Sequence, residues 1–122
     1  MTVTGPDFVA LQVQDLEAAA AFYESQLGLR RAAVSPPHAV VFDTTPAFAV
    51  RDPQPGVDVA TIRPHPGAGV VLWLAADDAQ TMHDAMSATG IEIAVAPFDG
   101  PFGRTFTFRD LDGYAITVHD RA

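Results

Sequence analysis

Hydrophobic and polar residues alternate along residues 8–14, which is the pattern of a half-buried strand. The apolar members of this pattern, predicted to face a core, are Val9, Leu11 and Val13. Asp15 follows, and its carboxylate can accept the free N–H groups of a helix's first turn. Apolar residues then recur at helical spacing until Gly28, which can take the left-handed conformation that ends a helix. The pattern therefore predicts a strand followed by a helix.

The same order occurs twice along the chain. Three short apolar segments follow the first helix, at about residues 30–34, 38–42 and 47–51. The second half predicts a strand at 70–76, a helix from Asp77-Asp78 to Thr89 closed by Gly90, and strands at 91–96, 104–109 and 113–119. Between the halves, proline and glycine dominate, and only residues 57–62 could pair as a short edge strand.

This internal repeat predicts the α+β class, with two tandem βαβββ modules in a single domain, residues 1–122. The first module covers about residues 7–52, the linker about 53–68 and the second module about 69–120. Each four-stranded sheet would carry its helix on one face. The two sheets together would form an eight-stranded, incompletely closed barrel around a central cleft.

Several phrases of the sequence resemble one known superfamily. They are Val9-Ala10-Leu11-Gln12-Val13-Gln14-Asp15-Leu16-Glu17, Ala21-Phe22-Tyr23, Leu27-Gly28-Leu29 and Phe106-Thr107-Phe108-Arg109-Asp110-Leu111-Asp112-Gly113. In order and spacing they resemble the vicinal oxygen chelate superfamily of glyoxalases, bleomycin-resistance proteins and extradiol dioxygenases, which usually has proline where Leu111 stands. The chain is closest in character to the metal-free, bleomycin-resistance type.

The resemblance also implies where a metal would be bound. In the family's enzymes, histidine or glutamate residues from equivalent strands of both modules hold a divalent metal. The corresponding positions here are Phe8, Ala49, Val71 and Thr117. Three of these side chains have no lone pair, and one threonine hydroxyl does not make a site for Zn²⁺, Fe²⁺ or Mn²⁺. The four histidines, His38, His65, His83 and His119, lie on different predicted elements. We therefore expect no metal and no cofactor.

Alternate residues of each strand should face the cleft. The side chains predicted to bind a ligand are Phe8, Gln12, Ala49, Val71, Trp73, Phe98, Phe102, Thr105, Thr107, Thr117 and His119. Trp73 could stack on a planar ligand, or it could fill the cleft floor or a subunit contact. Phe98 and Phe102 belong to a predicted loop, 97–104, where they could border the ligand or anchor the loop. Asp99 is expected to pair with Arg104.

Composition and charge narrow the partners. The 122 residues include no cysteine and no lysine, and the net charge is −8, so nucleic-acid binding is not expected. An acidic protein could attract a cationic ligand, although such a charge also keeps a small protein soluble. We see no membrane-spanning run and no signal peptide, so we expect a cytoplasmic protein that does not bind membranes.

The first functional hypothesis is metal-independent binding and sequestration of a planar, drug-like natural product, as in the bleomycin-resistance proteins. The resemblance implies a homodimer whose clefts are shared between chains. The alternative is a metal-free lyase, cyclase, epimerase or isomerase of a natural-product pathway, with His119 as the acid or base. A third hypothesis is an interaction module whose cleft is filled by side chains.

Overall fold

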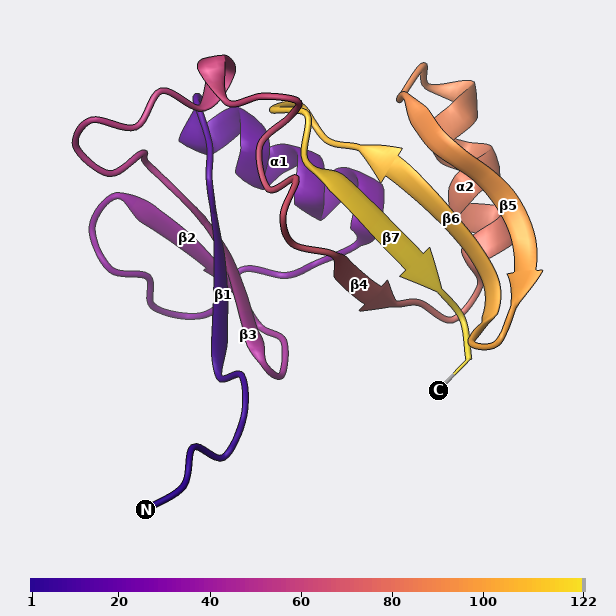
Figure 1. Ribbon diagram of the computed structural model, residues 1–122, viewed down its shortest axis with the longest axis horizontal. Helices are drawn as coiled ribbons and strands as arrows, with labels where there is room; N and C mark the ends of the chain where they lie inside the picture. Colours follow the sequence, from indigo (N-terminus) through magenta and orange to yellow (C-terminus); the bar gives the residue numbers. More distant parts are fainter. Residues whose placement is uncertain (122) are drawn as a thin grey trace. The chain divides into compact units, whose positions relative to one another are not determined.

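The computed structural model describes residues 1–121, in two compact units: residues 1–60, and a second unit that begins at Thr61. The first unit contains β1 (Phe8–Gln12), α1 (Leu16–Leu27), β2 (Ala39–Phe42), β3 (Ala47–Arg51) and most of a short 3-10 turn, η1 (Val59–Thr61). The second unit contains β4 (Leu72–Ala75), α2 (Ala79–Ala88), β5 (Ile93–Gly100), β6 (Gly103–Arg109) and β7 (Ala115–His119) (Figure 1). Within the described residues, no helix has the length and apolar character of a membrane span.

The sheet of the first unit has three strands in the order β1-β3-β2. β1 runs parallel to β3, and β2 runs antiparallel to it. One face packs on α1 through an aromatic cluster in which Tyr23 contacts Phe48 at 5.2 Å between ring centroids and Phe42 at 6.2 Å. Leu11 and Val13 are buried, as their alternation predicted. The opposite face of this sheet is not covered by α1, and it lines a pocket that is described below.

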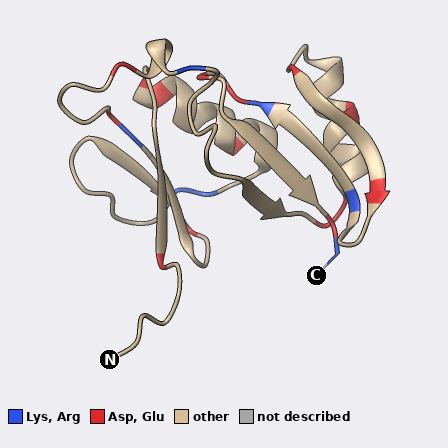
Figure 2. Cartoon of the chain, viewed as in Figure 1, with Lys and Arg blue, Asp and Glu red and all other residues tan. Residues whose placement is uncertain are grey.

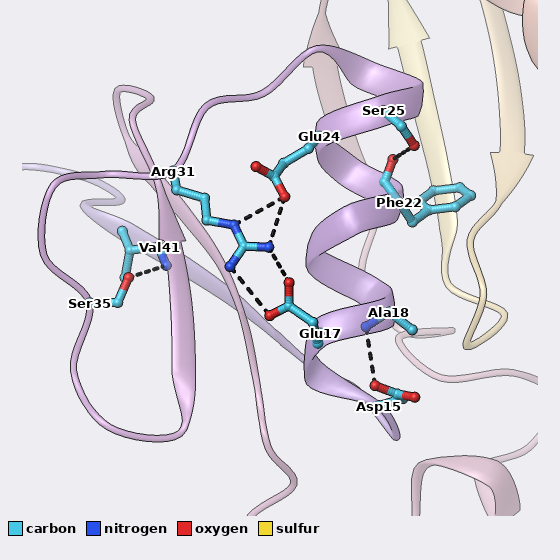
Figure 3. Close-up of polar contacts among 9 residues, drawn as sticks. All are labelled: Asp15, Glu17, Ala18, Phe22, Glu24, Ser25, Arg31, Ser35 and Val41. Carbon is cyan, nitrogen blue, oxygen red and sulfur yellow. Dashed lines mark hydrogen bonds and ion pairs between the residues drawn. The ribbon is translucent and has the colours of Figure 1, made fainter.

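The expected strand at 30–34 is wrong. In this segment Arg31 forms an isolated bridge to Phe42, and no regular fourth strand extends the sheet beyond β2. The Val41 N–H on this edge donates to the Ser35 hydroxyl at 2.9 Å instead of to a backbone carbonyl (Figure 3). The Arg31 side chain reaches back to α1, where it bonds to Glu17 at 2.6 Å and to Glu24 at 2.8 Å (Figure 3). Two backbone hydrogen bonds remain on this edge, from the Ala32 N–H to the Val41 carbonyl and from the Asp43 N–H to the Arg30 carbonyl, both at 2.8 Å. The pairing is therefore present but too short to form a strand.

The sheet of the second unit has four strands in the order β4-β7-β6-β5. β4 and β7 are parallel, and the other neighbours are antiparallel. Phe106, Phe108, Ile116 and Val118 are fully buried on one face, and α2 contributes Met86 to the same core. Because side chains alternate along each strand, Thr105, Thr107, Thr117 and His119 share the other face.

Both helices begin as predicted. Asp15 accepts a hydrogen bond from the Ala18 N–H at 3.1 Å (Figure 3). Asp78 accepts one from the Thr81 N–H at 3.0 Å. Hydrogen bonds from the Thr81 N–H and hydroxyl hold the pKa of Asp78 below its ordinary value. Gly28 caps α1 in the left-handed conformation, and α2 is capped by Thr89 and followed by Gly90, which is also left-handed with a φ of 82°.

Two further expectations need correction. The predicted loop 97–104 is mostly strand, because β5 continues to Gly100 and β6 begins at Gly103, which leaves a tight hairpin. The possible edge strand at 57–62 forms η1 instead. The α+β class is confirmed, and the element order is consistent with tandem modules. However, the described residues form seven strands in two sheets, of three and four strands, and no closed barrel.

Candidate functional site

The open face of the second sheet carries a cluster of three aromatic rings, which we call the aromatic platform: Trp73, Phe102 and His119. Ring centroids lie 5.8 Å apart for Trp73 and Phe102, 5.6 Å for Trp73 and His119, and 6.0 Å for Phe102 and His119. The parallel pairing of β4 with β7 places Trp73 beside His119, and the β5–β6 hairpin supplies Phe102. Each ring therefore comes from a different part of the unit.

The platform is exposed although its members are large. Trp73 is 44% exposed and Phe102 is 50% exposed. β4 and β7 carry no Lys, Arg, Asp or Glu, so the strands beneath the rings are uncharged (Figure 2). An exposed, uncharged aromatic surface can stack on a planar ligand at low entropic cost, because these side chains have few torsions to order.

His119 is held in a defined orientation. Its Nδ1 lies 3.0 Å from the backbone carbonyl of Arg121, and a carbonyl can only accept, so Nδ1–H is the donor. In the neutral ring this leaves Nε2 as an acceptor. His119 can therefore contribute both a ring face and one hydrogen-bond acceptor.

Thr105 and Thr117 on this face are buried, Thr107 is partly buried, and all three hydroxyls make hydrogen bonds. The Thr107 and Thr117 hydroxyls share a hydrogen bond of 2.8 Å, and the Thr105 hydroxyl donates to the Gly103 carbonyl at 3.0 Å. In the Thr107–Thr117 pair, one of the two protons remains for another acceptor. The threonines therefore form a small polar spot in an apolar surface, and their role in ligand binding stays a prediction.

The remaining predicted residues of the second unit, Val71 and Phe98, are 73% and 44% exposed. Val71 precedes β4, and Phe98 pairs with Thr105 along β5. Neither belongs to the ring contacts of the platform. The expected Asp99–Arg104 ion pair is confirmed, at 3.1 Å, and Arg104 also donates to Gln80 at 2.9 Å.

The first unit has a pocket of about 500 Å³ on the sheet face opposite α1. Alanines form its floor, with Ala10 opposite Ala49 and Ala39 opposite Arg51 in the strand register. The lining residues are Phe8, Ala10, Pro36, Pro37, His38, Ala39, Ala49, Arg51, Asp52, Pro53 and Pro55. Because these floor side chains end at Cβ, the sheet leaves a hollow there, of a size typical for small-molecule sites.

The lining includes two of the predicted ligand residues, Phe8 and Ala49. Its prolines, Pro36, Pro37, Pro53 and Pro55, are not among the predicted ligand residues, and the last two belong to the predicted linker. The predicted ligand residue Gln12 lies outside the lining, and its side-chain oxygen accepts a hydrogen bond from the Gln54 N–H at 2.7 Å. Gln12 therefore fastens the start of the linker to β1.

The residues present do not fit a resident metal. Phe8, Ala49 and Val71 offer no donor atom, and the Thr117 hydroxyl is bonded to Thr107. Across residues 1–121, no three histidine, cysteine, aspartate or glutamate side chains are grouped so that they could share an ion. The chemistry of this donor set does not match what Zn²⁺ or Fe²⁺ needs.

The family model of the Glyoxalase/Bleomycin resistance protein/Dioxygenase superfamily matches residues 5–118. The chain belongs to this superfamily. The resemblance found in the strand, helix and turn motifs is thereby confirmed. No curated protein sequence gives a significant match.

Several solved structures are similar over almost the whole chain. TnmS3, an antibiotic binding protein from Streptomyces sp. CB03234, is 22% identical with a TM-score of 0.74, covering 100% of this chain and 99% of that one. A lactoylglutathione lyase from Agrobacterium tumefaciens is 25% identical with a TM-score of 0.66, covering 98% and 96%. A glyoxalase/bleomycin resistance protein from Streptomyces sp. CB03234 is 23% identical with a TM-score of 0.69, covering 93% and 97%. The neighbours thus include both a binding protein and an enzyme.

Proposed function

We propose that this protein binds and sequesters a planar, drug-like natural product without a metal ion. The observation that carries the proposal is the exposed aromatic platform of Trp73, Phe102 and His119. A polycyclic ligand could stack on these rings. The donor-poor positions Phe8, Ala49 and Val71 favour binding over metal-dependent chemistry. The structural similarity to TnmS3, an antibiotic binding protein, supports the same choice.

The test is a titration followed through Trp73, the only tryptophan in the chain. A panel of planar antibiotics is added in metal-free buffer, and the ligand is checked afterwards by mass spectrometry. Saturable quenching with the ligand recovered intact is the expected result. Phe102→Leu should weaken the binding about tenfold, because the stacking of a planar ring system on one aromatic side chain contributes about 1–3 kcal/mol, as for a nucleic-acid base.

A matched control is Leu111→Ala, which changes an exposed apolar residue at the opposite end of β6. This variant should bind as the wild type does. If Phe102→Leu and Leu111→Ala bind equally well, or if no compound quenches Trp73, the platform is not a binding site.

The alternative function is a metal-free lyase, cyclase or isomerase, and one observation favours it. The bond from Nδ1 to the Arg121 carbonyl leaves the neutral His119 ring with Nε2 free to accept a proton. A carboxylate often strengthens a catalytic histidine base. No carboxylate among the described residues forms a hydrogen bond or ion pair with His119, whose Nδ1 instead bonds to the Arg121 carbonyl. A different result of the same titration would be that the wild type converts the ligand chemically while His119→Gln does not. That result would establish an enzyme and overturn the sequestration proposal.

The homodimer expected from the family belongs to the same proposal, and so does an arrangement of the tandem modules around a ligand cleft. Light scattering at several protein concentrations tests the dimer directly. A molar mass near 12.9 kDa at all concentrations would mean a monomer. The aromatic platform itself does not depend on that outcome, because all three rings belong to one chain.

A further inference from the structure

The pocket of the first unit has one feature that the aromatic platform lacks, which is a cation. Arg51 ends β3 and is partly buried in the lining beside alanines and prolines. Its Nε donates to the Asp52 carbonyl at 2.9 Å, which fixes the plane of the guanidinium. No carboxylate of residues 1–121 forms an ion pair with it. The two terminal nitrogens of Arg51 are therefore available to a ligand.

The acidic neighbour of Arg51 is engaged elsewhere. Asp52 Oδ2 lies 3.0 Å from Nδ1 of His38, and the Asp52 N–H donates to the His38 carbonyl at 2.9 Å. His38 has a φ of 66°, an unusual conformation for a residue other than glycine, and this pair of bonds holds it there. Residues 36–38 are thus fastened to the end of β3 as a wall of the pocket.

We propose that this pocket binds a planar, apolar compound that carries a carboxylate, with Arg51 as the residue that recognises the anion. A guanidinium presents a flat pair of N–H donors that matches a carboxylate, and such charge-assisted bonds are stronger where water is excluded. The alanines and prolines of the lining leave a hollow of about 500 Å³ with space for fused rings, and Phe8 adds an aromatic ring to the lining. This preference runs against the net charge of −8, which by itself favours cationic ligands.

The pocket lies within residues 8–55 and includes no residue of the aromatic platform, so the inference goes beyond the platform, although Phe8 and Ala49 of the lining are two of the predicted ligand residues. The probes are anthracene-9-carboxylate and its neutral analogue 9-anthracenemethanol, both followed by the anisotropy of their own fluorescence. The wild type should bind the carboxylate at least tenfold more tightly than the alcohol. Arg51→Gln should remove this selectivity and leave the affinity for the alcohol unchanged.

Three further variants separate recognition from folding. Ala10→Phe fills the floor at an exposed position and should abolish binding of both probes. Asp52→Asn keeps an acceptor for His38 but removes a negative charge, so it should strengthen carboxylate binding several-fold. Arg30→Gln removes the same charge as Arg51→Gln at an exposed position outside the pocket, and it should change neither affinity.

The proposal is overturned if the wild type binds neither probe or binds both equally. It is also overturned if Arg30→Gln lowers the affinity for the carboxylate probe as much as Arg51→Gln does. Trp73 quenching by planar antibiotics is measured separately with the Arg51→Gln protein. If the Arg51→Gln protein keeps its Trp73 quenching but loses its selectivity for the carboxylate probe, the pocket is a binding site distinct from the platform. If Phe102→Leu loses Trp73 quenching but keeps its selectivity for the carboxylate probe, the result bears only on the platform. The two proposals can therefore fail independently.

Discussion

Replacement of Gly103 by alanine should strongly destabilise the second unit, because no side chain fits at this turn. Gly103 has a φ of 90°, a conformation that residues with a Cβ rarely adopt. A Cβ there would collide with Asp120 Oδ1 and would lie 2.9 Å from the Cβ and 3.0 Å from the N of Arg121. The residue that must move, Asp120, has a structural task of its own.

The Asp120 carboxylate joins three elements. Its Oδ1 accepts from the Arg104 N–H at 2.9 Å at the start of β6, and its Oδ2 accepts from the Ala79 N–H at 3.1 Å at the start of α2. A hydrogen bond to a charged group contributes about 1.5–3 kcal/mol, and left-handed strain adds about 1–2 kcal/mol. Gly103→Ala should therefore lower the free energy of unfolding by about 2.5 to 5 kcal/mol. This is a large part of the stability of a small protein.

Urea unfolding followed by circular dichroism measures this loss. Gly69→Ala is the matched control, since its Cβ would meet nothing within 4 Å and its φ is not positive. It should change the free energy of unfolding by less than about 0.5 kcal/mol. If the two variants unfold at the same urea concentration, the turn tolerates a side chain and our reasoning about Gly103 fails. Since the Arg121 N–H donates to the Phe102 carbonyl at 3.0 Å, Gly103→Ala should also weaken quenching of Trp73 by ligands.

Two other expectations concern the stability of the same unit. Phe106 is fully buried between the sheet and α2, so Phe106→Ala should cost about 3–5 kcal/mol in thermal or urea unfolding, while truncation of exposed Leu111 should cost little. The pKa of Asp78 is lowered in the folded state, so its stabilising effect is complete above the unfolded pKa and is lost as pH falls through the folded pKa. The stability of the wild type should therefore decline more steeply between pH 5 and about pH 3 than that of Asp78→Asn. Equal slopes in urea midpoint against pH would contradict this account of the helix cap.

The part of the site that was predictable follows from strand alternation. Once β4 and β7 are placed, Trp73, Thr117 and His119 must share a face, and the register confirms that they do. The contact of Phe102 with Trp73 was not predictable, since it depends on the hairpin that replaced the expected loop. Similarly, the pocket floor of Ala10 and Ala49 follows from parity, but its walls come from turns whose direction the local sequence does not specify.

The sequence by itself determined the α+β class, the order of elements, both helix caps and the lack of donor side chains at the expected metal positions. These features depend on local periodicity and on the chemistry of single residues. Tertiary structure decided the rest. The segment at 30–34 pairs with β2 only through an isolated bridge, while the Val41 N–H donates to Ser35, and the Asp52–His38 bonds leave Arg51 available in its pocket. Such outcomes depend on which of several possible partners a polar group reaches, and only the folded chain brings those partners together.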